Sequence, residues 1–457
     1  MIEQLRDRVV ELERRLGADS SNSSRPPSSD GLRKPPRPAR PREQGTRRPG
    51  KQPGAPGAHL AQVPDPDEVV VHTPARCVGC GGELTSAPVT GTQTRQVFDL
   101  PEIRLRVVEH QAEQRACGCG QATWAAFPGL VRARACYGPR VRALGCYLLV
   151  AQHLPVERAA RLLGDVLGVP VAAGTLAGLV SEAAEGLQLP GGFVDAVGEH
   201  LRHAAVANFD ETGARVAGRL HWVHSASTPA LTWQIVHPKR GLDAMDAAGI
   251  LPGFAGVAVH DGWAPYWHYQ VEHALCGAHL LRELDAVADQ PRQGWAAGMR
   301  ELLTDATAVT DQARAAGAAQ VDDQTRDRLH ARYQRLLDDG YAANPPRGAR
   351  RRQRSPAARL LGRLDSHRAE VLRFLEDLRV PFTNNQAERD IRMVKLQQKI
   401  SDCWRTLPGT HAFLTVRSYL STARKQDMNA FDVLQQLFGG RPWLPAPAHS
   451  APAAMPP

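Results

Sequence analysis

The sequence of 457 residues predicts a multidomain protein of the α+β class. Three observations support this prediction. Strand patterns and turn residues alternate over 67–134, and helical spacing dominates over 139–190. A strand-rich segment from about 198 is followed by long helical stretches over 272–380. Because 42% of the residues are hydrophobic, the chain can bury more than one core, and we expect two or three domains.

Charge is unevenly distributed along the chain, whose formal net charge is +9. The segment between residues 31 and 54 carries +7 of it, since eight basic residues face only Glu43. A basic arm of this kind favours a polyanion such as nucleic acid through counterion release, and a solubilising linker is the alternative. The basic residues are Arg33, Lys34, Arg37, Arg40, Arg42, Arg47, Arg48 and Lys51.

Neither a targeting segment nor a membrane span is expected. The first eight residues carry charge throughout and lack the apolar core of a signal peptide. The longest apolar candidate, near Leu144 to Val150, falls well short of the roughly 20 residues that cross a bilayer. We therefore expect a cytoplasmic protein, with its eight cysteines present as thiols or metal ligands.

The amino-terminal 66 residues predict a short helix and a linker. Apolar residues alternate by three and four over 1–17, which is typical of a short coiled-coil helix that pairs with a second copy or with its own chain. A frayed amphipathic end is the alternative. Residues 18–66, rich in Ser, Pro, Gly and Arg, predict a disordered basic linker.

Two thiol pairs mark residues 67–134 as a small β module. An alternating pattern over 103–108 predicts one of its strands. Four thiolates form the closed tetrahedral site of a structural Zn²⁺, although one pair could also be reduced surface thiols. We expect the zinc ligands to be Cys77, Cys80, Cys117 and Cys119, and the core thiols to be Cys136, Cys146 and Cys403.

Residues 135–197 predict a helical domain resembling a helix-turn-helix. Helical spacing over 156–167 is followed by Gly-Val-Pro and by a second helix from about Ala173. The alternative is that the helices simply pack together. We favour that alternative over insertion into a DNA groove, because the second helix lacks Arg, Lys, Asn and Gln on its early turns.

Three carboxylates carry the strongest chemical signal. A strand ending at Phe209 and a strand over 254–260 place Asp210 and Asp261 at strand ends, and a hairpin joins 219–225 to 231–237. Such neighbouring carboxylates tolerate each other when cations lie between them. Two Mg²⁺ ions fit this requirement and support in-line displacement at phosphorus.

A third acid, Glu388, lies on a segment with helical spacing and would complete the ligand set. Arg392 and Lys395 share its helical face and could hold the phosphates of a DNA end, with ordinary pairing on an exposed helix as the alternative. Asn384 and Asn385 would cap the helix and direct its positive end toward the same anion. Because the chain has 47 acidic residues, solvated surface charge is the alternative interpretation of the three acids.

Together with these residues, eight motifs make the chain resemble a bacterial transposase of the insertion sequence 66 family. The resemblance runs over nearly the whole chain. Its motifs are Ser21-Asn-Ser-Ser-Arg-Pro-Pro-Ser-Ser-Asp, Cys77-x-x-Cys80, Tyr137-Gly-Pro, Gln152-His-Leu-Pro-Val-Glu-Arg, Asp210-Glu-Thr, His260-Asp-Gly-Trp, Leu275-Cys-Gly-Ala-His-Leu-Leu-Arg-Glu-Leu and Asn384-Asn-Gln-Ala-Glu-Arg.

The resemblance implies a ribonuclease-H-like α/β catalytic core over 198–440, with a helical insertion over 272–380. It implies an Asp-Asp-Glu triad of Asp210, Asp261 and Glu388, a zinc-binding segment, and companion proteins encoded by the same element. Lys395 matches a basic residue that similar transposases carry seven positions after their Glu. Asp402 stands where the family pattern would have Gly.

Several side chains around these motifs have open interpretations. Cys276 and His279 could share a metal, but we favour a buried thiol and a hydrogen-bonded His. Trp263 and Trp404 could stack on unpaired bases or belong to the core. A second basic cluster is expected in a loop that contacts DNA backbone; it comprises Arg347, Arg350, Arg351, Arg352 and Arg354.

We therefore predict a transposase that cuts the ends of its element with two Mg²⁺ and joins the freed 3′-hydroxyl to target DNA. A dimer or larger assembly would pair the ends. The alternatives are a catalytically inactive DNA-binding protein derived from a transposase and a plain nuclease. The tail over 441–457 is Pro/Ala-rich. DNA contacts are expected from Arg33, Lys34, Arg47, Arg48, Arg351, Arg352, Asn385, Arg392 and Lys395.

Overall fold

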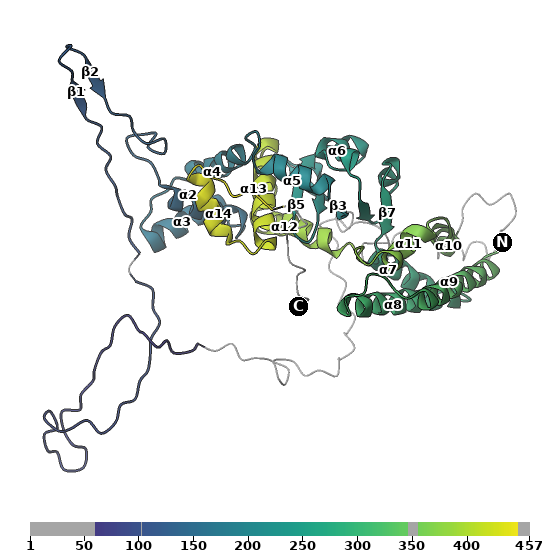
Figure 1. Ribbon diagram of the computed structural model, residues 1–457, viewed down its shortest axis with the longest axis horizontal. Helices are drawn as coiled ribbons and strands as arrows, with labels where there is room; N and C mark the ends of the chain where they lie inside the picture. The colour runs from purple at the N-terminus through teal and green to yellow at the C-terminus, as the bar shows by residue number, and fades with distance from the viewer. Residues whose placement is uncertain (1–59, 102, 346–354, 447–457) are drawn as a thin grey trace. The chain divides into compact units, whose positions relative to one another are not determined.

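A computed structural model of the chain describes residues 60–101, 103–345 and 355–446 (Figure 1). The predicted amino-terminal helix, most of the basic linker and most of the tail lie outside these residues. So do Arg33, Lys34, Arg47 and Arg48 of the arm, and Arg351 and Arg352 with the rest of the second basic cluster.

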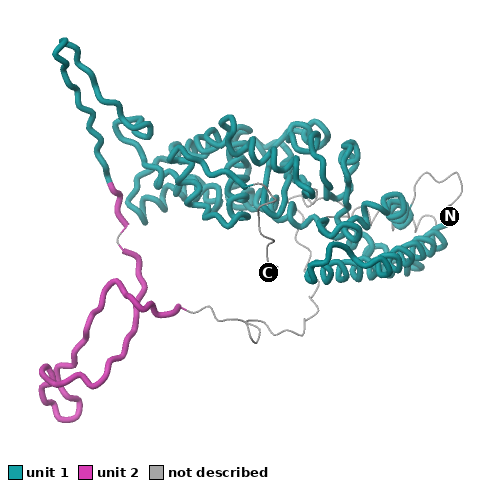
Figure 2. Tube along the Cα trace, in the orientation of Figure 1, with its two compact units in different colours: residues 1–32, 107–457 teal, residues 33–106 magenta. Residues whose placement is uncertain are grey.

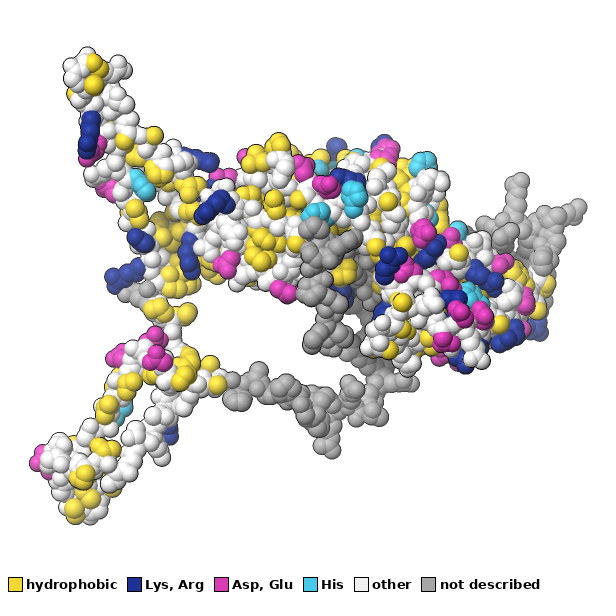
Figure 3. Space-filling view, viewed as in Figure 1, with side chains coloured by type: hydrophobic (Ala, Val, Ile, Leu, Met, Phe, Trp, Pro, Cys, Tyr) yellow, Lys and Arg dark blue, Asp and Glu magenta, His cyan; other side chains and the backbone are white. Residues whose placement is uncertain are grey.

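The described residues divide into two compact units, one up to Arg106 and the other from Val107 onward (Figure 2). The smaller unit consists of turns and extended segments. Within it, Gln96 bonds both backbone groups of Val63, and a single bridge joins Arg76 to Glu83. Many of its apolar side chains are exposed, including Val71 and Val97 (Figure 3).

The strand predicted over 103–108 does not form. Ile103 and Leu105 remain 48% and 43% exposed. An alternating pattern makes a strand only where a partner edge and a buried face are available, and these residues have neither. The larger unit instead begins with a short antiparallel hairpin of β1 (Gln114–Ala116) and β2 (Ala122–Trp124).

The segment predicted to be a helical domain is helical, and its helices share a core with the sheet and the last helices of the chain. It contains α2 (Pro139–Val150), α3 (Val156–Leu167), α4 (Ala173–Leu187) and α5 (Phe193–Arg202). The apolar side of α4 packs on α2 and on a later helix, α13 (Leu407–Lys425), which supports a packing role for α4. Among the predicted core thiols, Cys146 is buried, Cys403 is half-buried, and Cys136 is exposed, contrary to prediction.

A five-stranded mixed sheet follows, with strand order β5-β4-β3-β6-β7. The strands β3, β4 and β5 are antiparallel, and β6 and β7 run parallel to β3. The predicted hairpin of β4 and β5 is confirmed. The five strands are β3 (Val206–Val216), β4 (Arg219–Ser227), β5 (Thr232–His237), β6 (Val257–His260) and β7 (Glu272–Leu275).

Two strand boundaries differ from prediction. The first strand continues beyond Phe209 to Val216, because β4 pairs with it from Asn208 to Val216. The segment 272–275 is a strand and not the start of the helical insertion. Its buried run of His273 to Leu275 is short, and it is covered by β6 beside it and by α11 (Arg368–Glu376) packed on it.

A helical segment lies between β7 and the segment that carries Glu388. Its helices share a core with β6 and β7, to which Val259 and Leu275 contribute (Figure 1). They are α7 (Gly277–Ala288), α8 (Gly294–Ala315), α9 (Asp323–Ala343), α10 (Pro356–Ser366) and α11 (Arg368–Glu376). Shorter elements, α6 (Leu242–Ala248), η2 (Leu251–Gly253) and η3 (Ala264–His268), connect the strands.

The last helices return to the sheet. The helix α12 (Asn385–Ser401) buries Ala387, Ile391 and Val394, whose spacing forms one helical face, and packs on β3 and β4. Next to it, α13 packs on β5, and α14 (Ala430–Phe438) packs on α2. In the described part of the chain, no helix is both long enough and apolar enough to cross a bilayer.

Candidate active site

The register of β3 and β6 brings Asp210 and Asp261 to the same level of the sheet. Val206 lies opposite Val257, and Asn208 lies opposite Val259. The same offset sets Asp210 opposite Asp261, just past the last residue of β6. Asp210 was predicted to lie at the end of its own strand. It lies instead within β3, at the level where the parallel strand β6 ends.

Asn384 ties the start of α12 to β3. Its side chain accepts a hydrogen bond from Asn208 Nδ2 at 2.9 Å and donates one to the carbonyl of Phe209 at 2.7 Å. It is only 1% exposed. The predicted side-chain cap is therefore wrong, since the amide bonds β3 and not the helix. This link holds the first turn of α12, with Glu388, beside the residue that precedes Asp210.

A second link holds the same turn of α12 from the other side. Asp390 forms an ion pair with Lys425 of α13 at 2.6 Å, and both side chains are largely buried. Burial lowers the pKa of Lys425 to about 8, against the opposing effect of Asp390. The Lys425 ammonium also donates to the carbonyls of Thr228 and Leu231, so α12, α13 and the β4–β5 turn are held together.

The three predicted acids interact electrostatically. Burial raises the pKa of Asp210 well above its ordinary value, and the charges of Glu211, Asp261 and Glu388 raise it further. Burial likewise raises the pKa of Asp261. The direction of both shifts indicates a site that disfavours its own negative charge in the absence of a cation.

Glu211 is a fourth acid at this site that sequence reasoning missed. It is 4% exposed, forms an ion pair with Arg240, and accepts a hydrogen bond from the Tyr266 hydroxyl at 2.7 Å. Burial and the charge of Asp261 raise the pKa of Glu211 to about 7, and Arg240 opposes this shift. The sequence feature that could have identified Glu211 is its position next to Asp210 within the same strand.

Arg240 is held between two tryptophan rings. Its guanidinium carbon lies 3.9 Å from the ring centre of Trp263 and 4.8 Å from that of Trp222. Cation–π contact and the ion pair with Glu211 fix the guanidinium near the acids. Trp263 is half-buried and engaged by this stack, whereas Trp404 is half-buried and lies edge-on to Phe413.

A chain of neutral histidines supports the strand end that carries Asp261. The N–H of Gly262 donates to His260 Nδ1 at 3.0 Å, so the Nε2 proton of His260 donates to His273 Nδ1 at 3.0 Å. The Nε2 proton of His273 then donates to the Tyr269 carbonyl at 3.2 Å. Burial lowers the pKa of His260 well below its usual range, consistent with the neutral form.

Gly262 is required at this turn. Its φ is +84°, and a Cβ there would lie 3.0 Å from a methyl carbon of Leu275. The Asp261 carboxylate, whose Oδ1 accepts from the N–H of Trp263 at 2.8 Å, is thereby held at the tip of β6.

The predicted DNA-binding residues of α12 have different environments. Arg392 and Asn385 are exposed, as a contact to DNA would require. Lys395 is half-buried and donates to the carbonyl of Gly213 on β3. Burial lowers the pKa of Lys395. In this conformation the hydrogen bond from Lys395 links α12 to β3.

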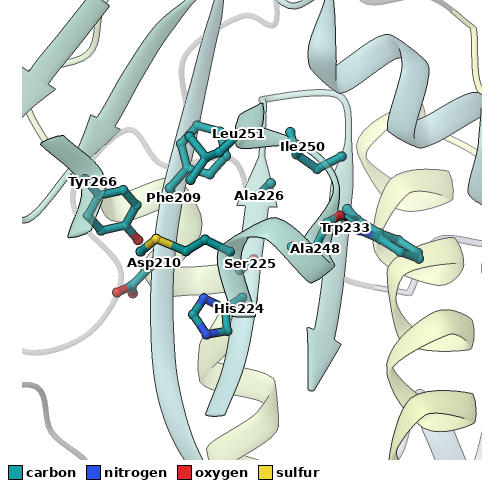
Figure 4. A pocket seen from close by; sticks show the side chains of 11 residues that line it. Phe209, Asp210, His224, Ser225, Ala226, Trp233, Ala248, Ile250, Leu251 and Tyr266 are labelled. Carbon is teal, nitrogen blue, oxygen red and sulfur yellow. Dashed lines mark hydrogen bonds between the residues drawn. The ribbon is translucent and has the colours of Figure 1, made fainter. Parts of the chain in front are cut away.

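A small cavity lies between β4, β5 and α6, next to Asp210 (Figure 4). Its volume is about 20 Å³, which is room for a single water molecule and not for a nucleotide. Its lining is mostly apolar, with Phe209, Met245 and Leu251, while His224 and Ser225 contribute polar atoms. Burial lowers the pKa of His224 to about 4.

The two thiol pairs form similar turns, and each compact unit contains one of the pairs. In the smaller unit, the Cys77 N–H donates to Gly82 and the Cys77 carbonyl accepts from Gly81. In the larger unit, the Cys117 N–H donates to Gln121 and its carbonyl accepts from Gly120. Backbone amides directed at the sulfur lower the pKa of Cys77 and Cys117, which favours thiolates.

Comparison with protein families is consistent with this arrangement. The sequence matches the family described as "Transposase IS66 family" over residues 134–412. It matches the "zinc-finger binding domain of transposase IS66" over 74–120, and a family of unknown function over 1–61. No curated protein matches the chain.

The fold is a mixed α/β one, and the zinc-finger match and the longer match both belong to DNA transposases. The chain belongs to the insertion sequence 66 family of transposases, since that family matches more than half of its length. The predicted resemblance and the predicted function as a transposase, with DNA as its partner, are thereby confirmed. The zinc-finger match supports the predicted structural zinc.

Proposed function

We propose that this transposase cuts DNA at the ends of its element and joins them to target DNA, with Asp210, Asp261 and Glu388 as its catalytic acids. The observation that carries the proposal is the shared level of Asp210 and Asp261 on adjacent parallel strands. The anchoring of α12 by Asn384 supports the third position.

The strand order supports a ribonuclease-H-like core. Three antiparallel strands are followed by two strands parallel to the first of them, and the helix that carries Glu388 packs on β3 and β4. Under this proposal the core spans 198–440, with the helices between Gly277 and Glu376 as its insertion.

The donor set fits Mg²⁺, which prefers carboxylate oxygens. Burial raises the pKa of both acids, and neighbouring acids raise that of Asp210 further, so a bound cation would stabilise both carboxylates, which supports metal binding at this position. When bound, Mg²⁺ would make an attacking water or 3′-hydroxyl more acidic and neutralise charge on the phosphate. We propose two such ions, held by Asp210, Asp261 and Glu388.

The surrounding residues have positioning roles in this proposal. Arg240 lowers the pKa of Asp261 and so favours the carboxylate form that binds a cation. Glu211 holds Arg240 in place through their ion pair. Arg392, exposed one turn beyond Glu388, is positioned to bind a phosphate of the DNA end.

The remaining segments are assigned to DNA recognition and assembly. Cys77, Cys80, Cys117 and Cys119 would bind one structural Zn²⁺ in a module over 67–134. The helical domain over 135–197 and the basic residues of the arm and of the second cluster would contact DNA. A dimer or larger assembly with companion proteins, acting in the cytoplasm at the nucleoid, completes the proposal.

The proposal is tested with purified protein, labelled DNA that carries the element ends, and Mg²⁺ or Mn²⁺. We expect metal-dependent nicking and strand joining by the wild type, and loss of both in Asp210→Asn. Asp327→Asn, which changes an exposed acid on α9, is the matched control and should retain activity. Binding without nicking would favour an inactive DNA-binding protein, and cutting without joining would favour a plain nuclease.

A further inference from the structure

Glu388 belongs to a second cluster of side chains besides the acidic one. Cys276, His279 and Glu388 each offer one ligand atom, and these atoms all lie within 4.8 Å of one another. In the part of the chain that the structure describes, this is the one set of three His, Cys, Asp or Glu side chains that meets that distance.

The backbone fixes this cluster through contacts with two segments. The N–H of Cys276 donates to the His260 carbonyl at 2.9 Å, which continues β7 beside β6. The N–H of Gly277 donates to the Phe382 carbonyl at 2.8 Å, and a Cβ at Gly277 would lie 2.1 Å from the Phe382 ring. The start of α7, with Cys276 and His279, is therefore held directly against the segment that leads into α12.

The imidazole of His279 has an unused buried nitrogen. Its Nδ1 lies 3.9 Å from Glu388 Oε1, is inaccessible to solvent, and has no hydrogen-bond partner among the described residues. The prediction that His279 is hydrogen-bonded is thus wrong for its Nδ1 atom. A neutral imidazole can offer the lone pair of such an unpaired nitrogen to a cation.

The thiol of Cys276 is buried and protonated. It is 1% exposed, and its sulfur accepts a hydrogen bond from the Asn384 N–H at 3.1 Å. Burial raises the pKa of Cys276 to about 11. A cation that binds this sulfur must displace the thiol proton to solvent, which thiophilic cations achieve and Mg²⁺ does not.

We propose that Cys276, His279 and Glu388 form a site for Zn²⁺ or a similar thiophilic divalent cation, separate from the paired thiols of the zinc-finger segment. Thiolate, imidazole and carboxylate are the ligands that Zn²⁺ prefers, and three of them leave a fourth position for water. Bond lengths of about 2.0 to 2.3 Å require the ligand atoms to approach one another by about 1 Å.

The site has a consequence for catalysis, which rests on the proposed function. In one side-chain orientation, Glu388 cannot be a ligand both of a thiophilic ion beside Cys276 and of a magnesium ion beside Asp210. Zn²⁺ in the new site therefore withdraws Glu388 from the acidic site and inhibits the transposase. Glu388 is 32% exposed at its side chain, which gives the ion a route from solvent.

Metal binding is tested without any activity measurement. Co²⁺ is added to the full-length protein isolated with its zinc, and the sulfur-to-cobalt charge-transfer band is recorded. We expect a band in the wild type and in Cys136→Ser, an exposed thiol that serves as control, and its loss in Cys276→Ser. His279→Gln should weaken Co²⁺ binding at least about tenfold. A band of equal strength in Cys276→Ser, or unchanged affinity in His279→Gln, overturns the proposal.

Circular dichroism of each variant establishes that the fold is retained. Should Cys276→Ser fail to fold, His279→Gln decides the outcome by its Co²⁺ affinity alone. Zn²⁺ is then titrated into the Mg²⁺-dependent cleavage assay, where we expect at least about tenfold higher Zn²⁺ for half-inhibition of His279→Gln than of wild type. Equal inhibition of both overturns the competition for Glu388. Absence of all cleavage contradicts the proposed catalytic function and leaves the Co²⁺ result standing.

Discussion

The carboxyl groups of Asp210, Glu211 and Asp261 all have pKa values raised by burial, that of Glu211 to about 7. An acid whose pKa is raised on folding binds more protons in the folded protein than in the unfolded chain between the two pKa values. Stability therefore falls as the pH rises through that window, which for Glu211 runs from 4.5 to about 7. These three buried acids therefore destabilise the metal-free protein at neutral pH.

We therefore expect Asp210→Asn to stabilise the metal-free protein at pH 8 while it abolishes catalysis. The neutral amide removes the repulsion with Asp261 and Glu388, and about 1.4 kcal/mol is gained for each unit of pKa shift that is relieved. Thermal unfolding in the presence of a chelator measures this change. The gain should shrink at pH 4, where the wild-type acid is itself protonated.

Magnesium supplies the control for this prediction. Mg²⁺ should raise the unfolding temperature of the wild type more than that of Asp210→Asn, since the ion binds the folded acids. Asp327→Asn should match the wild type with and without the ion. A lower unfolding temperature of Asp210→Asn at pH 8 without metal would contradict the electrostatic argument.

Asp402 adopts a backbone conformation that suits glycine. Its φ is 62° and its ψ is −155° at the carboxyl end of α12, where the family pattern would have Gly. A side chain in this region costs on the order of 1 to 3 kcal/mol. Asp402→Gly should therefore raise the free energy of unfolding by about 1 kcal/mol, measured by denaturant titration. Asp402→Ala, which keeps a Cβ, is the control and should give no such gain.

At the scale of elements, the placement of α12 determines whether Glu388 reaches the acids. The sequence predicted the helix and its apolar face, because Ala387, Ile391 and Val394 repeat at helical spacing. It did not predict how the helix is anchored. Asn384 reads as a helix cap, and only the folded chain brings Asn208, 176 residues away along the chain, within reach of its amide.

We expect Asn384→Ala to reduce both stability and cleavage. The substitution leaves the Asn208 amide and the Phe209 carbonyl without their partner in a buried site, at a cost of about 1 to 3 kcal/mol. It also frees the first turn of α12, so cleavage should fall by more than the loss of folded protein explains. Denaturant titration and cleavage assays on the same preparations separate these effects.

The neighbouring Asn385 provides a matched control. Its side chain is exposed, so Asn385→Ala should leave stability within about 0.5 kcal/mol of wild type. Weaker DNA binding with unchanged stability would support the predicted contact of Asn385 with DNA. Equal stability of Asn384→Ala and Asn385→Ala would contradict the anchoring role of Asn384.

The strands show where sequence patterns stop being informative. The hairpin of β4 and β5 was predicted, since both strands are regular and adjacent in sequence. Asp210 was placed at a strand end because polar residues follow Phe209. Glu211 and Thr212 are nevertheless buried inside β3, since Arg240 and Tyr266 satisfy the Glu211 carboxylate from distant segments. In a sequence pattern, a polar residue is taken to mark the end of a strand. In the folded protein, the strand can continue through that residue when other segments supply partners for its side chain.

At the scale of the whole molecule, the two compact units differ in what stabilises them. The larger unit contains two extensive apolar cores, one around the helical domain and sheet and one in the insertion. The smaller unit leaves large apolar side chains exposed, among them Val69, Val71 and Leu100. A segment that buries so little apolar surface requires another source of stability, and a structural metal is the source that its thiols offer.

We therefore expect zinc removal to unfold the thiol-bearing segments and leave the core intact. A strong chelator, or the double variant Cys77→Ser with Cys80→Ser, should speed hydrogen exchange throughout 60–134, because metal binding and folding are one equilibrium there. Amides of the buried helix α13 should keep their protection, because their stability comes from apolar packing. Mass spectrometry of peptides from both units measures the two effects in one sample. Cys136→Ser, whose thiol lies outside the two pairs, is the control. Loss of protection in α13 on zinc removal would contradict the independence of the core, whereas unchanged exchange in 60–134 would contradict the zinc assignment.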